Sequence, residues 1–256
     1  MLLNRSAFAI LVCALCAPLL QPSLAIAGTY QSPNNPFSLT LPDDWRPVDP
    51  ATFERLKAAS LAQGKQVETV EAVYQVVKNG VDQPTVLTIA YQALPNESLA
   101  ELAAVAEKET TAEEDLFKIA QRYSVSTKDG MTDLDTSYPI VTDSKRQLVR
   151  AELVAEYRNK ARMHALTFFK PGREGVVHLG FLVLQSDYEA SRPVLDQIAS
   201  SIAFAPGHEL QPGAQKANLA KAETWKNLRS CGFALLYFVG FAVMVFTAYW
   251  VRHSFG

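Results

Sequence analysis

The sequence predicts an α+β protein, an α/β/α sandwich around a central antiparallel sheet with one C-terminal transmembrane helix. Three observations lead to this class. Several β-rich runs follow one another through short turns, which is typical of neighbouring antiparallel strands. Helical segments separate the groups of strands, so helices are expected to pack on the sheet faces. Residues 231–251 of the 256-residue chain are 21 consecutive residues without a charge.

The N-terminal segment has the pattern of a secretory signal peptide. Arg5 supplies a positive charge, an uncharged and mostly apolar run follows over residues 7–20, and small residues end at Ala27. We expect residues 1–27 to be removed by cleavage after Ala27. The alternative, an uncleaved signal anchor, is disfavoured by Pro18 and by the shortness of the apolar run.

A strand, a helix and a hairpin are predicted in the first half of the remaining chain. Residues 37–41 alternate apolar and polar side chains, as a half-buried strand does. Asp49-Pro50 supplies a favourable helix N-cap followed by a favourable first helical residue. Two β-rich runs then flank an Asn-Gly pair, which favours a hairpin with a tight turn. These runs cover residues 67–77 and 85–94.

The second half predicts a helix, a three-strand meander and a last helix. Ser98 and Glu101 form a capping box that opens a helical stretch to about residue 121, and a polar stretch follows over 124–145. Residues 191–201 have helical periodicity, with Pro193 in the first turn. The three runs of the meander are 146–157, 161–169 and 175–184.

Two motifs resemble those of PsbP-like domains and their bacterial relatives. Phe37-Ser-Leu-Thr-Leu-Pro-Asp-Asp-Trp45 is similar to the start of these domains, and the segment from Asp187 to Phe204 is similar to their close. The resemblance spans nearly all of residues 28–206 and implies an α/β/α sandwich. Members include accessory proteins of the thylakoid lumen and bacterial envelope proteins, which implies a domain that binds or assists other proteins. A membrane anchor departs from the soluble lumenal members, so neither a photosynthetic role nor any functional residue is carried over.

Residues 28–206 form the expected globular domain, and their composition excludes several classes of function. These 179 residues contain 18 basic and 24 acidic side chains, a net charge of −6. This balance disfavours nucleic acid and bare anionic lipid as partners of the domain. The domain contains no cysteine, which excludes a disulfide framework and a cysteine-ligated metal.

The C-terminal segment predicts a membrane anchor. A helix over residues 231–251 would cross the hydrocarbon core of a bilayer, about 30 Å, and contact lipid, with Trp250 and Arg252 in the headgroup zone. We expect residues 207–230 to form a polar basic tether and residues 252–256 a cytoplasmic stub. Basic residues before the helix favour the opposite orientation, but the signal peptide acts first. The expected location is therefore a bacterial inner membrane, with the domain in the periplasm.

Two histidines of the meander are the candidate metal ligands. His164 and His178 lie on neighbouring predicted strands, and a hairpin that turns about Gly172 places Leu166 opposite His178. His164 would then lie on the adjacent diagonal, which would allow both imidazoles to share a face. A metal site requires three or four ligands, and no third is evident, so two ordinary sheet histidines are the competing interpretation. We expect no cofactor.

An acidic run is the candidate surface for a protein partner. Glu113, Glu114 and Asp115 belong to it, and the competing interpretation is a solvated helix face. The domain lacks a nucleophile elbow, a zinc-protease motif and a phosphate-binding glycine loop. We therefore expect a non-catalytic, membrane-tethered envelope protein whose exported domain binds or helps assemble another envelope protein. The alternatives are a small-molecule or metal-binding module on the sheet face and, as the weakest, an enzyme of unrecognised type.

Overall fold

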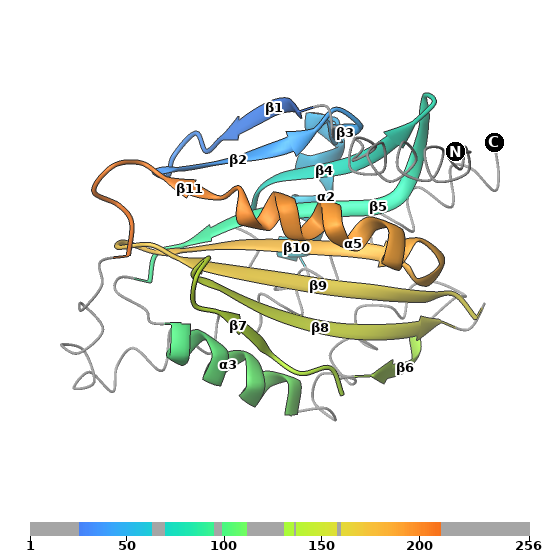
Figure 1. The fold of residues 1–256 in the computed structure, drawn as a ribbon. Helices are drawn as coiled ribbons and strands as arrows, with labels where there is room; N and C mark the ends of the chain where they lie inside the picture. Colours follow the sequence, from blue (N-terminus) through green and yellow to red (C-terminus); the bar gives the residue numbers. More distant parts are fainter. Residues whose placement is uncertain are drawn as a thin grey trace, which may run out of the picture.

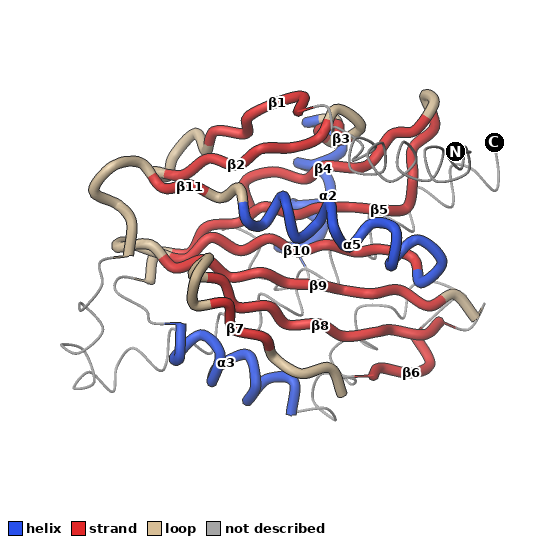
Figure 2. Tube along the Cα trace, in the orientation of Figure 1, coloured by secondary structure: helices blue, strands red, loops and turns tan. Residues whose placement is uncertain are grey.

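Antiparallel strands make up most of the described chain, with three helices among them, and the α+β class is confirmed (Figure 2). The computed structural model describes residues 26–62, 70–94, 99–111, 131–135, 137–157 and 160–210. The strands are β1 (Ile26–Gln31), β2 (Phe37–Pro42), β3 (Trp45–Pro47), β4 (Val70–Lys78), β5 (Val81–Gln92), β6 (Met131–Asp135), β7 (Val141–Asp143), β8 (Leu148–Tyr157), β9 (Arg162–Pro171), β10 (Val176–Leu184) and β11 (Ala203–Phe204). The helices are α2 (Pro50–Ala62), α3 (Leu99–Thr111) and α5 (Gln185–Ser200).

Within the described residues the strands form two sheets (Figure 1). The large sheet has the order β3-β4-β5-β10-β9-β8-β6, and β7 also pairs with β8. The small sheet has the order β1-β2-β11, so it joins the first and the last described strand to β2. The predicted meander is confirmed, because β8, β9 and β10 pair in succession.

The two faces of the large sheet bury separate apolar clusters. One cluster joins β2, α5 and alternate residues of β9 and β10, and it includes Phe37, Leu166, Phe181 and Leu195. The other joins α3 to the opposite residues of β8 and β9. Helices α5 and α3 therefore pack on opposite faces of the sheet. Side-chain alternation along each strand decides which of the two clusters a residue joins.

Two local predictions are confirmed in detail. The backbone N–H of Thr52 donates to Oδ2 of Asp49 at 2.9 Å, so Asp49 caps α2 as expected. Asn79 and Gly80 connect β4 and β5 with φ angles of 53° and 75°. Positive φ at both turn residues is the backbone that a two-residue hairpin requires, and Asn-Gly adopts it with little strain.

Two segments differ from the predictions. Helix α5 begins at Gln185 rather than at residue 191, so Pro193 lies inside the helix instead of in its first turn. The additional turns bury Tyr188 between α5 and the sheet, and this packing offsets the backbone N–H that Pro193 lacks. The polar stretch 124–145 contains two short strands, β6 and β7, which both pair with β8.

Several predicted segments lie outside the described residues. They are residues 1–25 of the expected signal peptide, residues 211–230 of the tether, the expected transmembrane segment 231–251 and the stub 252–256. Within the part of the chain that the structure describes, no helix has the length and apolar character needed to span a membrane. The ordered contacts continue past Pro206, because Glu209 bridges to Gly172 and Leu210 is buried.

Candidate functional site

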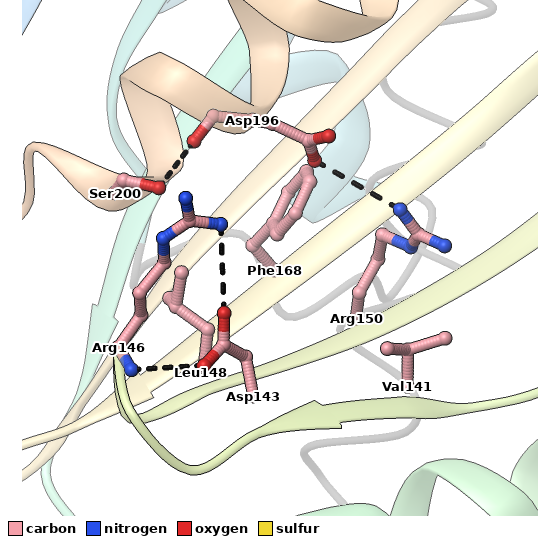
Figure 3. Close-up of a pocket in the computed structure, with 8 residues that line it drawn as sticks. All are labelled: Val141, Asp143, Arg146, Leu148, Arg150, Phe168, Asp196 and Ser200. Carbon is pink, nitrogen blue, oxygen red and sulfur yellow. Dashed lines mark hydrogen bonds and ion pairs between the residues drawn. The ribbon is translucent and has the colours of Figure 1, made fainter.

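A small pocket lies between α5 and the β7–β8 hairpin, and we call it the α5–β8 pocket. Its volume is about 130 Å³. Strands β8 and β9 form its floor, α5 forms one wall, and β7 with the following turn forms the other (Figure 3). The residues that line it are Val141, Asp143, Arg146, Leu148, Arg150, Phe168, Asp196 and Ser200.

The β7–β8 turn positions Asp143 and Arg146. Oδ1 of Asp143 accepts the backbone N–H groups of Lys145 and Arg146, both at 3.0 Å. Such side-chain acceptance is the usual role of aspartate in turns. Nη1 of Arg146 lies 3.5 Å from Oδ2 of Asp143, and the Arg146 side chain is 59% exposed. The Asp143 carboxylate is therefore committed to its own turn, while the Arg146 guanidinium remains accessible.

Arg150 reaches from β8 towards α5. Its Nη1 atom lies 3.9 Å from Oδ1 of Asp196, which is a charge contact longer than a hydrogen bond. The Ser200 hydroxyl donates to the backbone carbonyl of Asp196 at 2.6 Å, so it is occupied within the helix. Arg146 and Arg150 thus stand on two sides of the pocket, with Phe168 between them (Figure 3).

The remaining wall is apolar. Leu148 and Phe168 are buried, and the ring of Phe168 also packs edge-on against Phe181. Val141 is 38% exposed, and it is one of two exposed large hydrophobic residues among those described. The other is Val81, in the first position of β5.

A buried Glu152–His164 pair lies on the same sheet face as the pocket. Glu152 follows Arg150 by two residues in β8, so both side chains point to the α5 side. Nδ1 of His164 is 2.8 Å from Oε1 of Glu152, and Nε2 of His164 is 2.7 Å from Oε1 of Gln185. Both side chains of the pair are almost fully buried. Each ring nitrogen of His164 therefore has a polar partner, as a buried imidazole requires.

Tyr188 covers this pair from α5. Its ring stacks on the His164 imidazole, with centroids 3.8 Å apart and an angle of 4° between the planes. The Tyr188 hydroxyl is buried beside the Glu152 carboxylate. Burial raises the pKa of this hydroxyl, and the nearby Glu152 carboxylate raises it further. The phenol consequently stays neutral throughout the physiological range.

The Glu152–His164 pair is oriented like a catalytic base and its carboxylate, but a substrate cannot reach the imidazole. In hydrolase triads a carboxylate orients the imidazole through Nδ1, and Nε2 faces the reacting group. Here Nε2 is held by Gln185, and His164 is 2% exposed. The arrangement can fasten the start of α5 to the sheet, and it leaves no nitrogen available to a substrate.

The structure places the two predicted metal ligands on opposite faces of the sheet, which corrects the predicted pairing. His178 lies opposite Phe169, and His164 lies opposite Val183. The hairpin turns through residues 172–175 rather than about Gly172, and this shift exchanges the faces. His178 contacts Phe169 with ring centroids 5.0 Å apart, and burial lowers its pKa from 6.5 to about 3.

Among the described residues, neither the predicted acidic surface nor a metal site can be assembled from the sequence candidates. Glu113, Glu114 and Asp115 lie outside them, beyond the end of α3 at Thr111. Among the residues that are described, no three His, Cys, Asp or Glu side chains come close enough together to hold a metal ion. Within these described residues, neither His164 nor His178 belongs to such a set.

Sequence reasoning missed the charged residues that line or adjoin the pocket. Arg150 and Glu152 alternate with buried apolar residues in the interior of β8, and this pattern is the signal that could have found them. Asp196 and Gln185 could not be found in this way, because helix periodicity alone does not show which strand faces α5. The pocket depends on the pairing of β7 with β8, which was not predicted.

Comparisons with known proteins found likeness in structure alone. No protein-family profile matches the chain, and no curated protein matches its sequence. Cyanobacterial PsbP from Synechocystis sp. PCC 6803 is 14% identical with a TM-score of 0.46, over 71% of this chain and 95% of that one. LpqN, involved in cell envelope biogenesis of Mycobacterium tuberculosis, is 11% identical with a TM-score of 0.36, over 66% and 83%. The first belongs to the family that the two sequence motifs resemble.

Proposed function

We propose that this chain is a non-catalytic, membrane-tethered envelope protein whose exported domain binds another protein through the face that carries the α5–β8 pocket. The observation that carries the proposal is the pocket itself, which combines an exposed valine with two arginines over a buried apolar floor. The tethered location rests on the sequence, through the signal peptide expected over 1–27 and the anchor expected over 231–251.

The size of the pocket favours a protein partner over a cofactor or metabolite. Sites for small molecules usually enclose about 300–1,000 Å³, because most of the ligand surface is buried there. The α5–β8 pocket has about 130 Å³, which suits one side chain that enters from a larger surface. A partner protein supplies that surface, whereas a free molecule small enough to fit the pocket would make few contacts.

Arginine is one of the residue types enriched at protein interfaces, and two arginines line the pocket. A few residues of the enriched types usually supply most of the binding free energy. Val141 on β7 and Arg146 in the turn after it are both exposed, and Arg150 on β8 lies deeper in the pocket. Covering Val141 would remove apolar surface from water, which is favourable in proportion to the area buried.

The non-catalytic part of the proposal is supported by the Glu152–His164 pair. Both nitrogens of its buried imidazole already have polar partners within the protein. Turnover by the purified protein that disappears in His164→Gln would contradict this part.

Site-specific photocrosslinking in native membranes tests the binding face. A photoreactive phenylalanine analogue replaces Val141 in the full chain, and the matched control carries it at Val81. Both valines are exposed, but Val81 belongs to the β4–β5 hairpin, far from the pocket in the strand order. We expect a discrete crosslinked protein from position 141 and none from position 81.

Two results would contradict the proposal. One is the absence of any crosslinked protein from position 141 in membranes where the protein is folded and abundant. The other is the same set of products from both positions, which would indicate random collisions rather than a binding face.

A further inference from the structure

We infer that His164 is a buried imidazolium paired with the Glu152 carboxylate, and that this proton holds the first turn of α5 on the sheet. Loss of the proton in alkaline solution then releases the turn. The inference is independent of the partner of the α5–β8 pocket, so it goes beyond the proposed function. It rests on the atoms that face the two ring nitrogens of His164, on the burial of the pair and on the N-cap of α5.

Both ring nitrogens of His164 face oxygen atoms. Nδ1 lies 2.8 Å from Oε1 of Glu152, and Nε2 lies 2.7 Å from Oε1 of Gln185. An amide oxygen accepts hydrogen bonds and cannot donate them, so Nε2 carries a hydrogen. A neutral imidazole with its hydrogen on Nε2 would leave Nδ1 and an ionised carboxylate as two acceptors in contact. The contact therefore requires a second proton, between Nδ1 and Oε1.

The burial of the pair favours the same number of protons. The side chains of His164 and Glu152 are 3% and 6% exposed. With both protons present, the pair has no net charge. Removal of one proton leaves a net negative charge between sheet and helix, which is costly in a buried site. The shared proton belongs mainly to Nδ1, because histidine is a stronger base than glutamate by about two pKa units.

The other charged groups near the pair do not replace the imidazolium. Among the described residues, only His164 forms an ion pair with Glu152. Arg150 contacts Asp196 instead, at 3.9 Å. The remaining charged side chains of the neighbouring elements are Asp135 of β6, Glu156 on the same face of β8, Arg162 of β9, and Asp187, Glu189 and Arg192 close to Tyr188 in α5, while β10 places Val183 opposite His164. The arginines lower the cost of an unbalanced carboxylate without a direct contact to it.

The first turn of α5 depends on His164 because its own cap is weak. Leu184 occupies the N-cap position and makes no side-chain hydrogen bond to the helix. Gln185 and Tyr188 hold the turn instead, the first through Nε2 of His164 and the second by stacking on the ring at 3.8 Å between centroids. The ring of Tyr138 contacts the same imidazole edge-on, with centroids 6.0 Å apart. A positive charge on the imidazole strengthens the stacking, since cations are attracted to the faces of aromatic rings.

Loss of the proton changes what Gln185 faces. The remaining hydrogen stays on Nδ1, where it binds the Glu152 carboxylate, and Nε2 becomes an acceptor. Nε2 and Oε1 of Gln185 would then be two acceptors 2.7 Å apart, so the amide has to rotate or move away. Gln185 is exposed at the start of α5, which gives its side chain room to do so. The proton therefore decides whether the first turn is attached to the sheet.

Nitrogen-15 NMR of the full chain in detergent micelles, with labelled histidine, tests the location of the protons. The chain has four histidines, and the spectrum of His164→Gln identifies the signals of His164 by their loss. We expect both ring nitrogens of His164 to be protonated at pH 7.5, where an ordinary exposed histidine is mostly neutral.

Urea unfolding between pH 7 and 8.5 tests the consequence. Histidine in an unfolded chain loses its proton near pH 6.5, so above this pH unfolding releases the proton of His164. The unfolding equilibrium constant should rise by up to about tenfold per pH unit, until the folded pair loses its proton as well. Glu152→Gln keeps the size of the side chain but removes the carboxylate, so it should remove this rise. His178 does not contribute here, because burial keeps it neutral when folded and it is mostly neutral when unfolded above pH 6.5.

Glu174→Gln is the matched control, because Glu174 contacts His208 at 3.2 Å in a His–Glu pair that is partly exposed. It should keep the rise of the parent. The inference is overturned if either ring nitrogen of His164 is unprotonated at pH 7.5, or if the parent and Glu152→Gln have the same pH dependence above pH 7. Loss of the rise in Glu174→Gln would also overturn it. If Glu152→Gln does not fold, the NMR result decides alone.

Discussion

At the scale of single residues, the charge state of His178 is set by its position in the core. The side chain is 1% exposed and packs against Phe169, so a positive charge there would lose its hydration. Burial lowers its pKa from 6.5 to about 3. In the unfolded chain the same imidazole takes up a proton as the pH falls through 6.5, while in the folded protein it stays neutral until about pH 3.

This difference predicts a loss of stability in acid. Between pH 6.5 and 3 the unfolded state binds one more proton than the folded state, so the free energy of unfolding decreases with falling pH. The expected contribution is up to about 1.4 kcal/mol per pH unit. His178→Phe should remove that contribution, so its stability should fall less steeply in acid than that of the parent, as measured by urea unfolding at several pH values.

His208→Phe is the control, because His208 is partly exposed and its replacement leaves the buried imidazole of His178 in place. This variant should keep the acid loss that His178 contributes. Parallel curves for the parent and His178→Phe would contradict the account of a neutral core histidine.

At the scale of secondary-structure elements, the connection between β9 and β10 requires glycine for lack of space. A Cβ atom on Gly175 would collide with the carbonyl oxygen of Gln92 and with the ring of Tyr91. The obstruction includes backbone of the neighbouring strand β5, which cannot rotate away as a side chain can. The turn is closed by the N–H of Gly172, which donates to the carbonyl of Gly175 at 2.7 Å.

Gly175→Ala should therefore destabilise the protein. Forcing one extra carbon into a packed site usually costs about 1–3 kcal/mol, because strands or side chains have to shift. Gly28→Ala should have a much smaller effect, since a Cβ on Gly28 would meet nothing within 4 Å. Urea unfolding of both variants measures the difference, and equal stability of the two would show that β5 yields easily at this point.

The elements differ in how far local sequence could predict them. The cap at Asp49 and the Asn79-Gly80 turn depend on a few adjacent residues, and both are as predicted. Strands β6 and β7 are short and polar because they lie at the edge of the sheet. Their sequences therefore lack the apolar alternation that would predict a strand. The register of the β9–β10 hairpin depends on a four-residue loop, and misplacing its centre was enough to put His164 and His178 on the wrong relative faces.

The candidate site was beyond prediction for the same reason. Its residues come from β7, β8, β9 and α5, and their meeting depends on strand pairing and on the face that α5 covers. The sequence nevertheless contains one local trace of the site, because charges in the interior of a buried strand require partners. Arg150 and Glu152 are such charges.

At the scale of the whole molecule, the proposed location can be tested by the reactivity of single cysteines. With Cys231 replaced by serine, and with residues 1–27 removed as the sequence predicts, the chain has no other cysteine. Val81→Cys on the exposed hairpin should react with a membrane-impermeant maleimide in spheroplasts. Ser254→Cys, in the expected cytoplasmic stub, should react only after lysis. The reverse pattern would place the domain in the cytoplasm.

The pairing of β5 with β10 has a consequence for the order in which the molecule assembles. Val176 pairs with Gln92, which precedes it by 84 positions, so β5 is made long before the strand that completes it. Until then one edge of β5 is open, and its side chains Val86, Leu87 and Ile89 are among the most buried of the finished fold. Such an edge is a site for aggregation during synthesis. We therefore expect the nascent first half of the chain to need protection from aggregation until β10 has been made.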